Sequence, residues 1–264
     1  MTEADLAGPL LASDLYFVIH DDRTGQMRLH PRLTGLGLAA AVVGELMLAG
    51  RVAIAVAAGQ ARLTPLHPAP AGTSPGAVPS GAAAGTAMRR PAAAPAPGTA
   101  FAPGVAHAPG TTREPGAPPV IDGVAQTALG HIVAEPAHSL QTWLHFLART
   151  AHADVAARLT AAGLLRPPSG RRLPRRSRPQ VPVDPNVALW PTGRLNLAIQ
   201  RGQRLDVRDA LLLGLVVATT VARTVLWEPE SRHLADSIAG LPAPYRELIA
   251  QTKAAIGDAV ISPR

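Results

Sequence analysis

The stretch LGLAAAVVGELMLAGRV, residues 36–52, decides the class of fold. Leu38, Val42 and Leu46 recur at the spacing of one helical face. Gly50 then stands where a helix commonly ends, because glycine adopts the left-handed conformation that a helix terminus needs. The pattern predicts a helix over residues 36–49.

Helical patterns recur on both sides of this stretch. An apolar run at residues 10–20 leads into the turn-forming sequence DDRTG at residues 21–25. The most apolar run, residues 210–222, is shorter than the roughly 18 residues that a membrane-spanning helix needs, so we expect a buried core helix there. Further helices are predicted at residues 124–134, 139–150, 154–162, 195–199, 207–226 and 244–260. The sequence therefore predicts a mainly α fold.

Two segments predict β-hairpins. Residues 51–66 alternate small apolar residues around a turn at residues 58–59. Residues 166–191 follow with seven prolines and with apolar residues at even spacings: Val181, Val183, Val187 and Leu189. We expect an extended, protruding hairpin at about 166–191 with a basic tip, in an edge position because proline cannot donate to a strand ladder.

Residues 67–119 differ in composition from the rest of the chain. They are almost wholly Ala, Pro, Gly, Ser and Thr, and Phe101 is their one large apolar side chain besides Val and Met. Such a segment cannot bury enough surface to offset its ordering entropy, so we expect a disordered Ala/Pro/Gly-rich insertion. Residues 1–66 and 120–264 are then predicted to form two parts of one helical domain.

The positive charge is concentrated in one place. The chain holds 25 basic and 18 acidic residues, and residues 166–178 alone supply six arginines and no acid. This concentration indicates a basic patch on an otherwise balanced body. The chain has no cysteine, which excludes disulfides and thiolate metal sites, and its acidic N-terminus does not look like a secretory signal.

Four stretches, taken in their order, resemble the shorter bacterial form of the Golgi phosphoprotein 3 family. The resemblance implies a compact helical bundle with a β-hairpin on its membrane-facing side. It also implies an adaptor that binds phosphatidylinositol 4-phosphate in a basic pocket beside that hairpin. The stretches are residues 11–25, ELMLAGRV at 45–52, residues 122–129 leading into LQTWL at 140–144, and residues 155–165.

The resemblance also implies positions for the pocket. The family's pocket tryptophan falls on His30, its first arginine on Ala39, and its later pair of arginines on Arg149 and His152. The family's paired acids in the third stretch become Gln126 and Thr127. These departures put selective recognition of that one lipid in question.

We therefore expect lipid-headgroup contacts from two groups of residues. Arg149 and His152 lie one helical turn apart and could face one phosphate, with His30 stacking or hydrogen bonding beside them. The arginines of the hairpin tip suit phosphate because guanidinium binds it bidentately, and each adds about 1 kcal/mol near an anionic leaflet. They are Arg171, Arg172, Arg175, Arg176 and Arg178.

No pattern in the sequence indicates catalysis. A nucleophile motif, a phosphate loop and a dinucleotide fingerprint are all missing. His145, His152 and Asp154 lack a clear further ligand and a metalloprotease pattern, so we expect no metal and no cofactor. The sequence predicts a protein that is not an enzyme.

Three functions remain open. The first is a cytoplasmic adaptor, associated peripherally with the inner face of the membrane, with anionic lipid headgroups as ligands. Protein clients and a homo-oligomer through the hairpin would be its further partners. The second is a cytosolic protein-interaction module of the same fold without lipid binding. The third, nucleic-acid binding by a winged helix, is unlikely, because the helix at 154–162 offers only Arg158 as a long polar reader of base edges.

Overall fold

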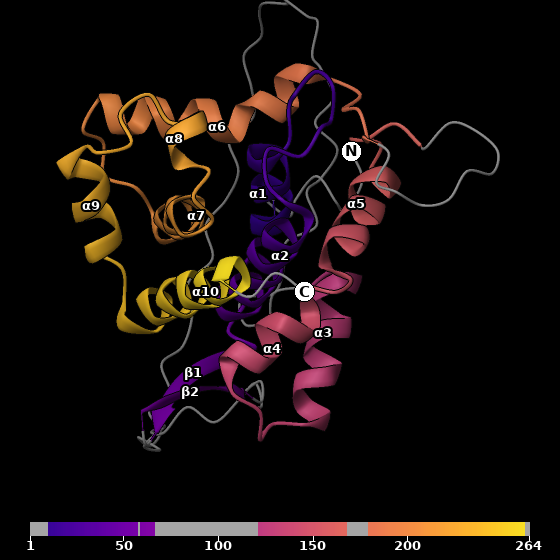
Figure 1. Cartoon of the computed structure of the whole chain (residues 1–264), viewed down its shortest axis with the longest axis vertical. Coiled ribbons are helices and arrows are strands. Elements are labelled where there is room, and N and C mark those ends of the chain that lie inside the picture. Colours follow the sequence, from indigo (N-terminus) through magenta and orange to yellow (C-terminus); the bar gives the residue numbers. More distant parts are fainter. Residues whose placement is uncertain (1–9, 58, 67–120, 168–178, 262–264) are drawn as a thin grey trace, which may run out of the picture. The chain divides into compact units, whose positions relative to one another are not determined.

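The computed structural model describes residues 10–57, 59–66, 121–167 and 179–261. These residues form ten helices and one two-stranded antiparallel sheet (Figure 1). The prediction of a mainly α fold with a β-hairpin is confirmed. The predicted disordered insertion, residues 67–119, and the arginines at 171–178 lie outside the described residues.

The elements are α1 (Leu11–Ile19), α2 (Pro31–Leu48), β1 (Val52–Ala57), β2 (Gln60–Pro65), α3 (Gly123–Ala134), α4 (Leu140–Leu147), α5 (Ala151–Ala161), α6 (Pro185–Gln200), α7 (Val207–Ala218), α8 (Ala222–Val225), α9 (Arg232–Ala239) and α10 (Ala243–Ile261).

Helices α1 and α2 form the centre of the described part. Every residue of α1 is buried, and α2 contacts α1, α3, α4, α5, α7 and α10. Both helices are apolar on nearly all sides, as expected for elements surrounded by other helices. Figure 1 shows α7, α9 and α10 on one side of this centre and α3, α4 and α5 on the other.

Among the described helices, α2 has the length and hydropathy that a membrane span requires. However, 78% of its apolar window is buried inside the protein, so its composition is accounted for by its place in the core. Most of the most apolar run lies in α7, whose residues 210–216 are all buried, as predicted. The single helix predicted over residues 207–226 is wrong beyond Ala218, because a turn with Thr220 at φ 66° separates α7 from α8.

The hairpin predicted at residues 51–66 is present. Strands β1 and β2 pair in the register Val52↔Pro65 to Ala57↔Gln60. Gly59 has φ 74°, a conformation that glycine adopts without strain and that a tight turn requires. The hairpin packs against α3, α4 and α10.

The hairpin predicted at about 166–191 is wrong from Pro185 onward. An isolated bridge joins Leu165 to Pro182, but the chain is helical from Pro185 onward. Asp184 caps this helix by accepting from the Asn186 N–H, and proline at the first helical position has the right φ already. The even spacing of Val187 and Leu189 was therefore no strand signal.

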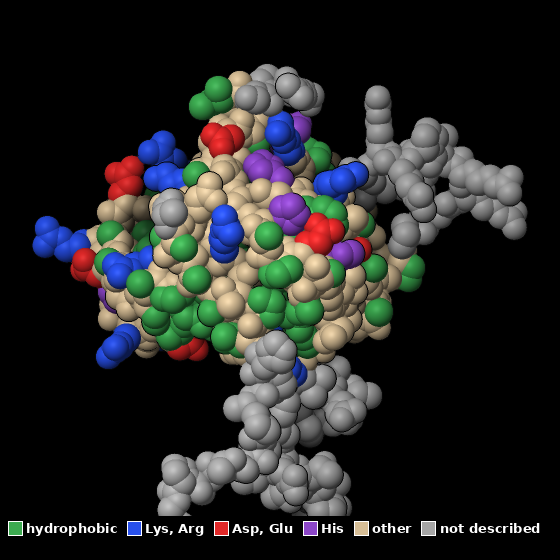
Figure 2. Space-filling model, turned by 90° about the horizontal axis from the view of Figure 1, so that it is seen from below, with side chains coloured by type: hydrophobic (Ala, Val, Ile, Leu, Met, Phe, Trp, Pro, Cys, Tyr) green, Lys and Arg blue, Asp and Glu red, His purple; other side chains and the backbone are tan. Residues whose placement is uncertain are grey.

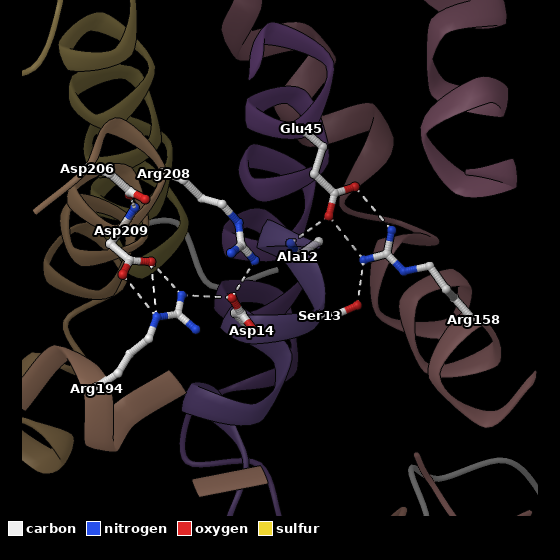
Figure 3. A network of polar contacts seen from close by, with 9 residues as sticks. All are labelled: Ala12, Ser13, Asp14, Glu45, Arg158, Arg194, Asp206, Arg208 and Asp209. Carbon is white, nitrogen blue, oxygen red and sulfur yellow. Dashed lines mark hydrogen bonds and ion pairs between the residues drawn. The ribbon is translucent and has the colours of Figure 1, made fainter. Parts of the chain in front are cut away.

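A buried carboxylate joins α1, α2 and α5 (Figure 3). Glu45 of α2 accepts from the backbone N–H of Ala12 at 2.7 Å, which satisfies a free amide at the start of α1. The same carboxylate accepts hydrogen bonds from both terminal nitrogens of Arg158, at 3.1 and 3.2 Å. Arg158 also donates to Ser13 and to Asp122, the N-cap of α3. Although burial opposes the charged form, Glu45 and Asp122 raise the pKa of Arg158 above its usual range.

A second ionic group joins α1 to α6 and α7. Asp14, which is 3% exposed, accepts from Arg194 of α6 and from Arg208 of α7 (Figure 3). Arg194 also donates to Asp209, so each charge in the group is compensated. Helix α1 is thus held by hydrogen bonds to Glu45 and Arg158 on one side and by the ion pairs of Asp14 on the other.

Substitution of Gly35 tests the close packing of α2. An alanine Cβ at Gly35 would lie 2.5 Å from the carbonyl oxygen of Ala148, which is backbone and cannot simply rotate away. We expect Gly35→Ala to lower the free energy of unfolding by about 1–3 kcal/mol, the usual cost of overpacking. Urea denaturation measures this change.

Gly130→Ala is the matched control. Gly130 lies inside α3 with nothing within 4 Å of an added Cβ, so alanine should stabilise the protein by about 0.5–1 kcal/mol. Equal effects of the two variants would contradict the packing described for α2.

Candidate functional site

A cavity of about 390 Å³ lies where the end of α1 meets the start of α5; we call it the histidine cavity. Its walls also come from the loop after α1 and from the two residues that follow the arginine-rich stretch. Gly25, with φ 67°, lets the loop approach Gln180, because a Cβ at this position would overlap the Gln180 carbonyl oxygen. The lining residues are Tyr16, His20, Gly25, Gln26, Met27, Leu29, Pro31, His152, Pro179 and Gln180.

Three rings form one wall of the cavity. The ring of His20 stacks on that of Tyr16, with centroids 3.9 Å apart and planes inclined by 15°. The Nε2 atoms of His20 and His152 lie 3.2 Å apart, although these residues are 132 positions apart in the sequence. Tyr16 Oη makes a long hydrogen bond, 3.5 Å, to Gln180 Oε1.

The hydrogen bonds assign the protons of the two histidines. His20 Nδ1 lies 2.7 Å from the carbonyl oxygen of Tyr16, which can only accept, so Nδ1 carries the proton. In neutral His20, Nε2 is then an acceptor, and the proton between the rings belongs to His152 Nε2. The remaining nitrogen of neutral His152, Nδ1, carries a lone pair and has no hydrogen bond to any described residue.

The Nε2 atoms of the pair lie within hydrogen-bond distance of each other. The ring centroids of His20 and His152 are 5.3 Å apart while their Nε2 atoms are 3.2 Å apart, so the rings meet through their nitrogen-bearing edges. Across the described ranges, no group of three or more His, Cys, Asp or Glu residues could hold a metal ion.

Burial keeps both histidines neutral at neutral pH. Desolvation lowers the pKa of His20 to about 4, opposed by its hydrogen bond to Tyr16 and assisted by the nearby charges of His152 and Arg28. Desolvation also lowers the pKa of His152. The pair therefore contributes no formal charge to the cavity at pH 7.

Arg28 is the cation beside the pair. Its Nε donates to the carbonyl oxygen of His20 at 3.1 Å, and its Nη2 lies 3.7 Å from carboxylate oxygens of Asp21 and Asp22. Hydrogen bonds from Thr24 lower the pKa of Asp21. The DDRTG sequence is the turn that was predicted, and its acids also balance Arg28.

The structure separates Arg149 and His152, which were predicted to face one phosphate. His152 lines the histidine cavity, but Arg149 lines a second cavity of about 810 Å³, the Arg149 cavity, together with His131, Phe146 and Asp154. The helical spacing assumed for the pair does not apply, because α5 begins only at Ala151 and Arg149 lies in the turn before it.

The other predicted positions differ in accessibility. His30 is exposed and caps α2 by accepting from the Arg32 N–H, and its neighbour Pro31 lines the histidine cavity. Ala39 is fully buried in α2, so nothing at this position can reach a phosphate. The five hairpin arginines lie outside the described residues.

Sequence reasoning missed Tyr16, His20 and Gln180. The spacing of Tyr16 and His20, four residues apart at the end of an apolar helix, was visible, but the partner His152 was not. Figure 2 views the domain from below, where basic side chains are scattered and do not form a single patch.

Comparison with protein families identifies the fold. The sequence profile of Golgi phosphoprotein 3 (GPP34) matches residues 11–97 and 103–260, which is most of the chain. The chain belongs to the Golgi phosphoprotein 3 family. The resemblance stated from the four stretches is thereby confirmed, whereas a search among curated proteins gave no significant match. Within this Golgi phosphoprotein 3 family member, the histidine cavity carries His152 at a position where the resemblance implies an arginine.

The buried histidine predicts acid sensitivity. The pKa of His20 is about 4 in the folded chain against 6.5 when unfolded, so between these values only the unfolded chain binds the proton. Acidification from pH 7 to pH 4 should therefore cost up to about 3 kcal/mol of unfolding free energy through this residue. Urea denaturation at a series of pH values measures it.

The control is His20→Phe, which keeps a ring against Tyr16 but does not titrate. The unfolding free energy of the wild type should fall relative to this variant as the pH drops. Parallel pH profiles for the two proteins would contradict a buried neutral His20.

Proposed function

We propose that this protein is a peripheral membrane adaptor that binds anionic, phosphoinositide-type headgroups in the histidine cavity. The observation that carries the proposal is that two residues lining this cavity directly follow the basic stretch in the sequence. Pro179 and Gln180 line the cavity and directly follow the stretch that holds Arg171, Arg172, Arg175, Arg176 and Arg178. Membership of the Golgi phosphoprotein 3 family supports the same ligand class.

Local electrostatics support an anion in this place. His152 is the second residue of α5, so the cavity lies at the positive end of a helix dipole. The cation Arg28 donates to the carbonyl oxygen of His20. A cavity of about 390 Å³ is of the size that small-molecule ligands occupy.

The function that we propose is non-catalytic and needs no cofactor. The protein would reside in the cytoplasm and meet the inner face of the membrane through the headgroup site and the basic stretch. Protein clients and a second copy of the chain are the further partners of such an adaptor.

A protein-interaction module without lipid binding is the second candidate. Two observations favour it: Ala39 is buried where the family resemblance implies an arginine, and α6 exposes apolar side chains. Leu189 and Trp190 are 46% and 61% exposed, which is unusual for neighbouring large apolar residues. Nucleic-acid binding is less well supported, because Arg158, its expected base reader, is engaged by Glu45 and Asp122.

Vesicle co-sedimentation of the full chain tests the proposal. Phosphatidylcholine vesicles containing phosphatidylinositol 4-phosphate should bind the protein, and plain phosphatidylcholine vesicles should not. Binding should weaken at high salt, because part of it comes from screened charges. At mildly acidic pH, His152→Ala should weaken binding about tenfold, since it removes a hydrogen bond worth about 1.5 kcal/mol that the protonated ring donates to the phosphate.

His145→Ala is the matched control, since His145 lies in α4 away from the cavity. Equal binding to the two kinds of vesicle, or none to either, would favour the protein-interaction module. Equal weakening by His145→Ala and His152→Ala would show that the headgroup does not bind in the histidine cavity.

A further inference from the structure

The neutral His20–His152 pair offers no donor to an anion. His20 Nδ1–H is used by the Tyr16 carbonyl oxygen, and His152 Nε2–H is used by His20 Nε2. The nitrogen left over, His152 Nδ1, presents a lone pair, which repels a phosphate oxygen. A neutral pair in the wall of the cavity is therefore a poor anion site.

One added proton turns the pair from a poor anion site into a favourable one. A proton on His152 Nδ1 leaves the bond to His20 intact, turns Nδ1 into a donor and gives the pair one positive charge. A second proton, on His20 Nε2, would set two N–H groups against one another at 3.2 Å and break the bond. The pair can thus take up one proton without losing its hydrogen bond. That proton makes His152 Nδ1 a hydrogen-bond donor to a phosphate.

None of the charged groups around the pair stabilises the added proton, so its uptake depends on a bound anion. From α1, Tyr16 stays neutral, because burial raises its pKa above the usual range. From the loop after α1, Arg28 is positive, and Asp21 and Asp22 pair with it and not with either ring. Residues 179–180 supply Gln180, which does not titrate. The start of α5 adds a positive helix end, which Asp154 in the same turn partly offsets, but Asp154 lines the Arg149 cavity and not the histidine cavity. No described carboxylate contacts the pair to stabilise the imidazolium, so an anion in the cavity is the missing counter-charge.

We propose that headgroup binding in the histidine cavity is coupled to the uptake of one proton by the His20–His152 pair. This inference rests on the proposed function and adds its regulation. Affinity for a phosphate monoester rises as the pH falls from about 7.5 to about 5.5, by up to about tenfold per pH unit when a full proton is taken up. The headgroup changes in the opposite direction, because its phosphate loses charge on protonation near pH 6. A rise in affinity towards acid therefore reports the protein and not the lipid.

Calorimetry measures the coupling directly. The full chain is titrated with vesicles of phosphatidylcholine and phosphatidylinositol 4-phosphate in two buffers that differ in ionisation enthalpy, at each of several pH values. The difference in heat gives the protons taken up. The wild type should take up a proton at neutral pH and bind more tightly at acidic pH.

Two variants separate the role of the proton from that of the hydrogen bond. His152→Gln keeps an N–H donor that needs no added proton, so binding should persist and the proton uptake should vanish. The pH dependence of the affinity should then reflect only the ionisation of the headgroup phosphate. His145→Gln removes a histidine outside the cavity and should change neither quantity. Thermal melting checks that both variants are folded.

The outcomes are distinguishable. Binding to these vesicles without proton uptake, or with the same uptake in His152→Gln, overturns the coupling and leaves the proposed function standing. Failure to bind them at every pH overturns the proposed function and the coupling together. Histidine NMR of the free protein adds an independent criterion: two rings that titrate separately near 6.5 would contradict the shared hydrogen bond.

Discussion

The carboxylate of Glu45 is the constraint on which the rest of the structure depends. It is buried in α2, it accepts from the first turn of α1, and it holds Arg158 near the end of α5. A buried charge of this kind is tolerated only when its partners are in place, so it fixes the position of all three helices. Glu45 belongs to the stretch that also decides the fold from the sequence.

This fixed point determines the geometry of the histidine cavity. Arg158 meets Ser13 at the start of α1, and His152 meets His20 at its end, so α1 and α5 run antiparallel. The two contacts are six or seven residues apart on each helix, or roughly 10 Å. The hydrogen bond between Arg158 and Ser13 at one end therefore holds the two histidines in register at the other. The functional site and the core share one framework.

Much of the fold could be predicted, because it follows from local patterns. The helix expected at 36–49 lies within α2 apart from its last residue, and the turn near Gly59 closes the predicted hairpin. The strand assigned to Val187 and Leu189 failed because an Asp-Pro helix start at 184–185 outweighs an even spacing of apolar residues. The site was harder, since the partner of His20 is distant in sequence. Moreover, α5 begins only at Ala151, so Arg149 and His152 do not share a helix. The sequence shows no break between them, because its helical pattern continues through these residues.

The most direct measurement is an NMR titration of the full chain with a soluble headgroup, glycerophosphoinositol 4-phosphate, at mildly acidic pH. The account predicts chemical-shift changes at the rings of His20 and His152 and at the side chain of Gln180. It predicts none at His131 and Phe146, which line the Arg149 cavity. Shifts confined to the Arg149 cavity, or no shifts at saturating headgroup, would contradict it.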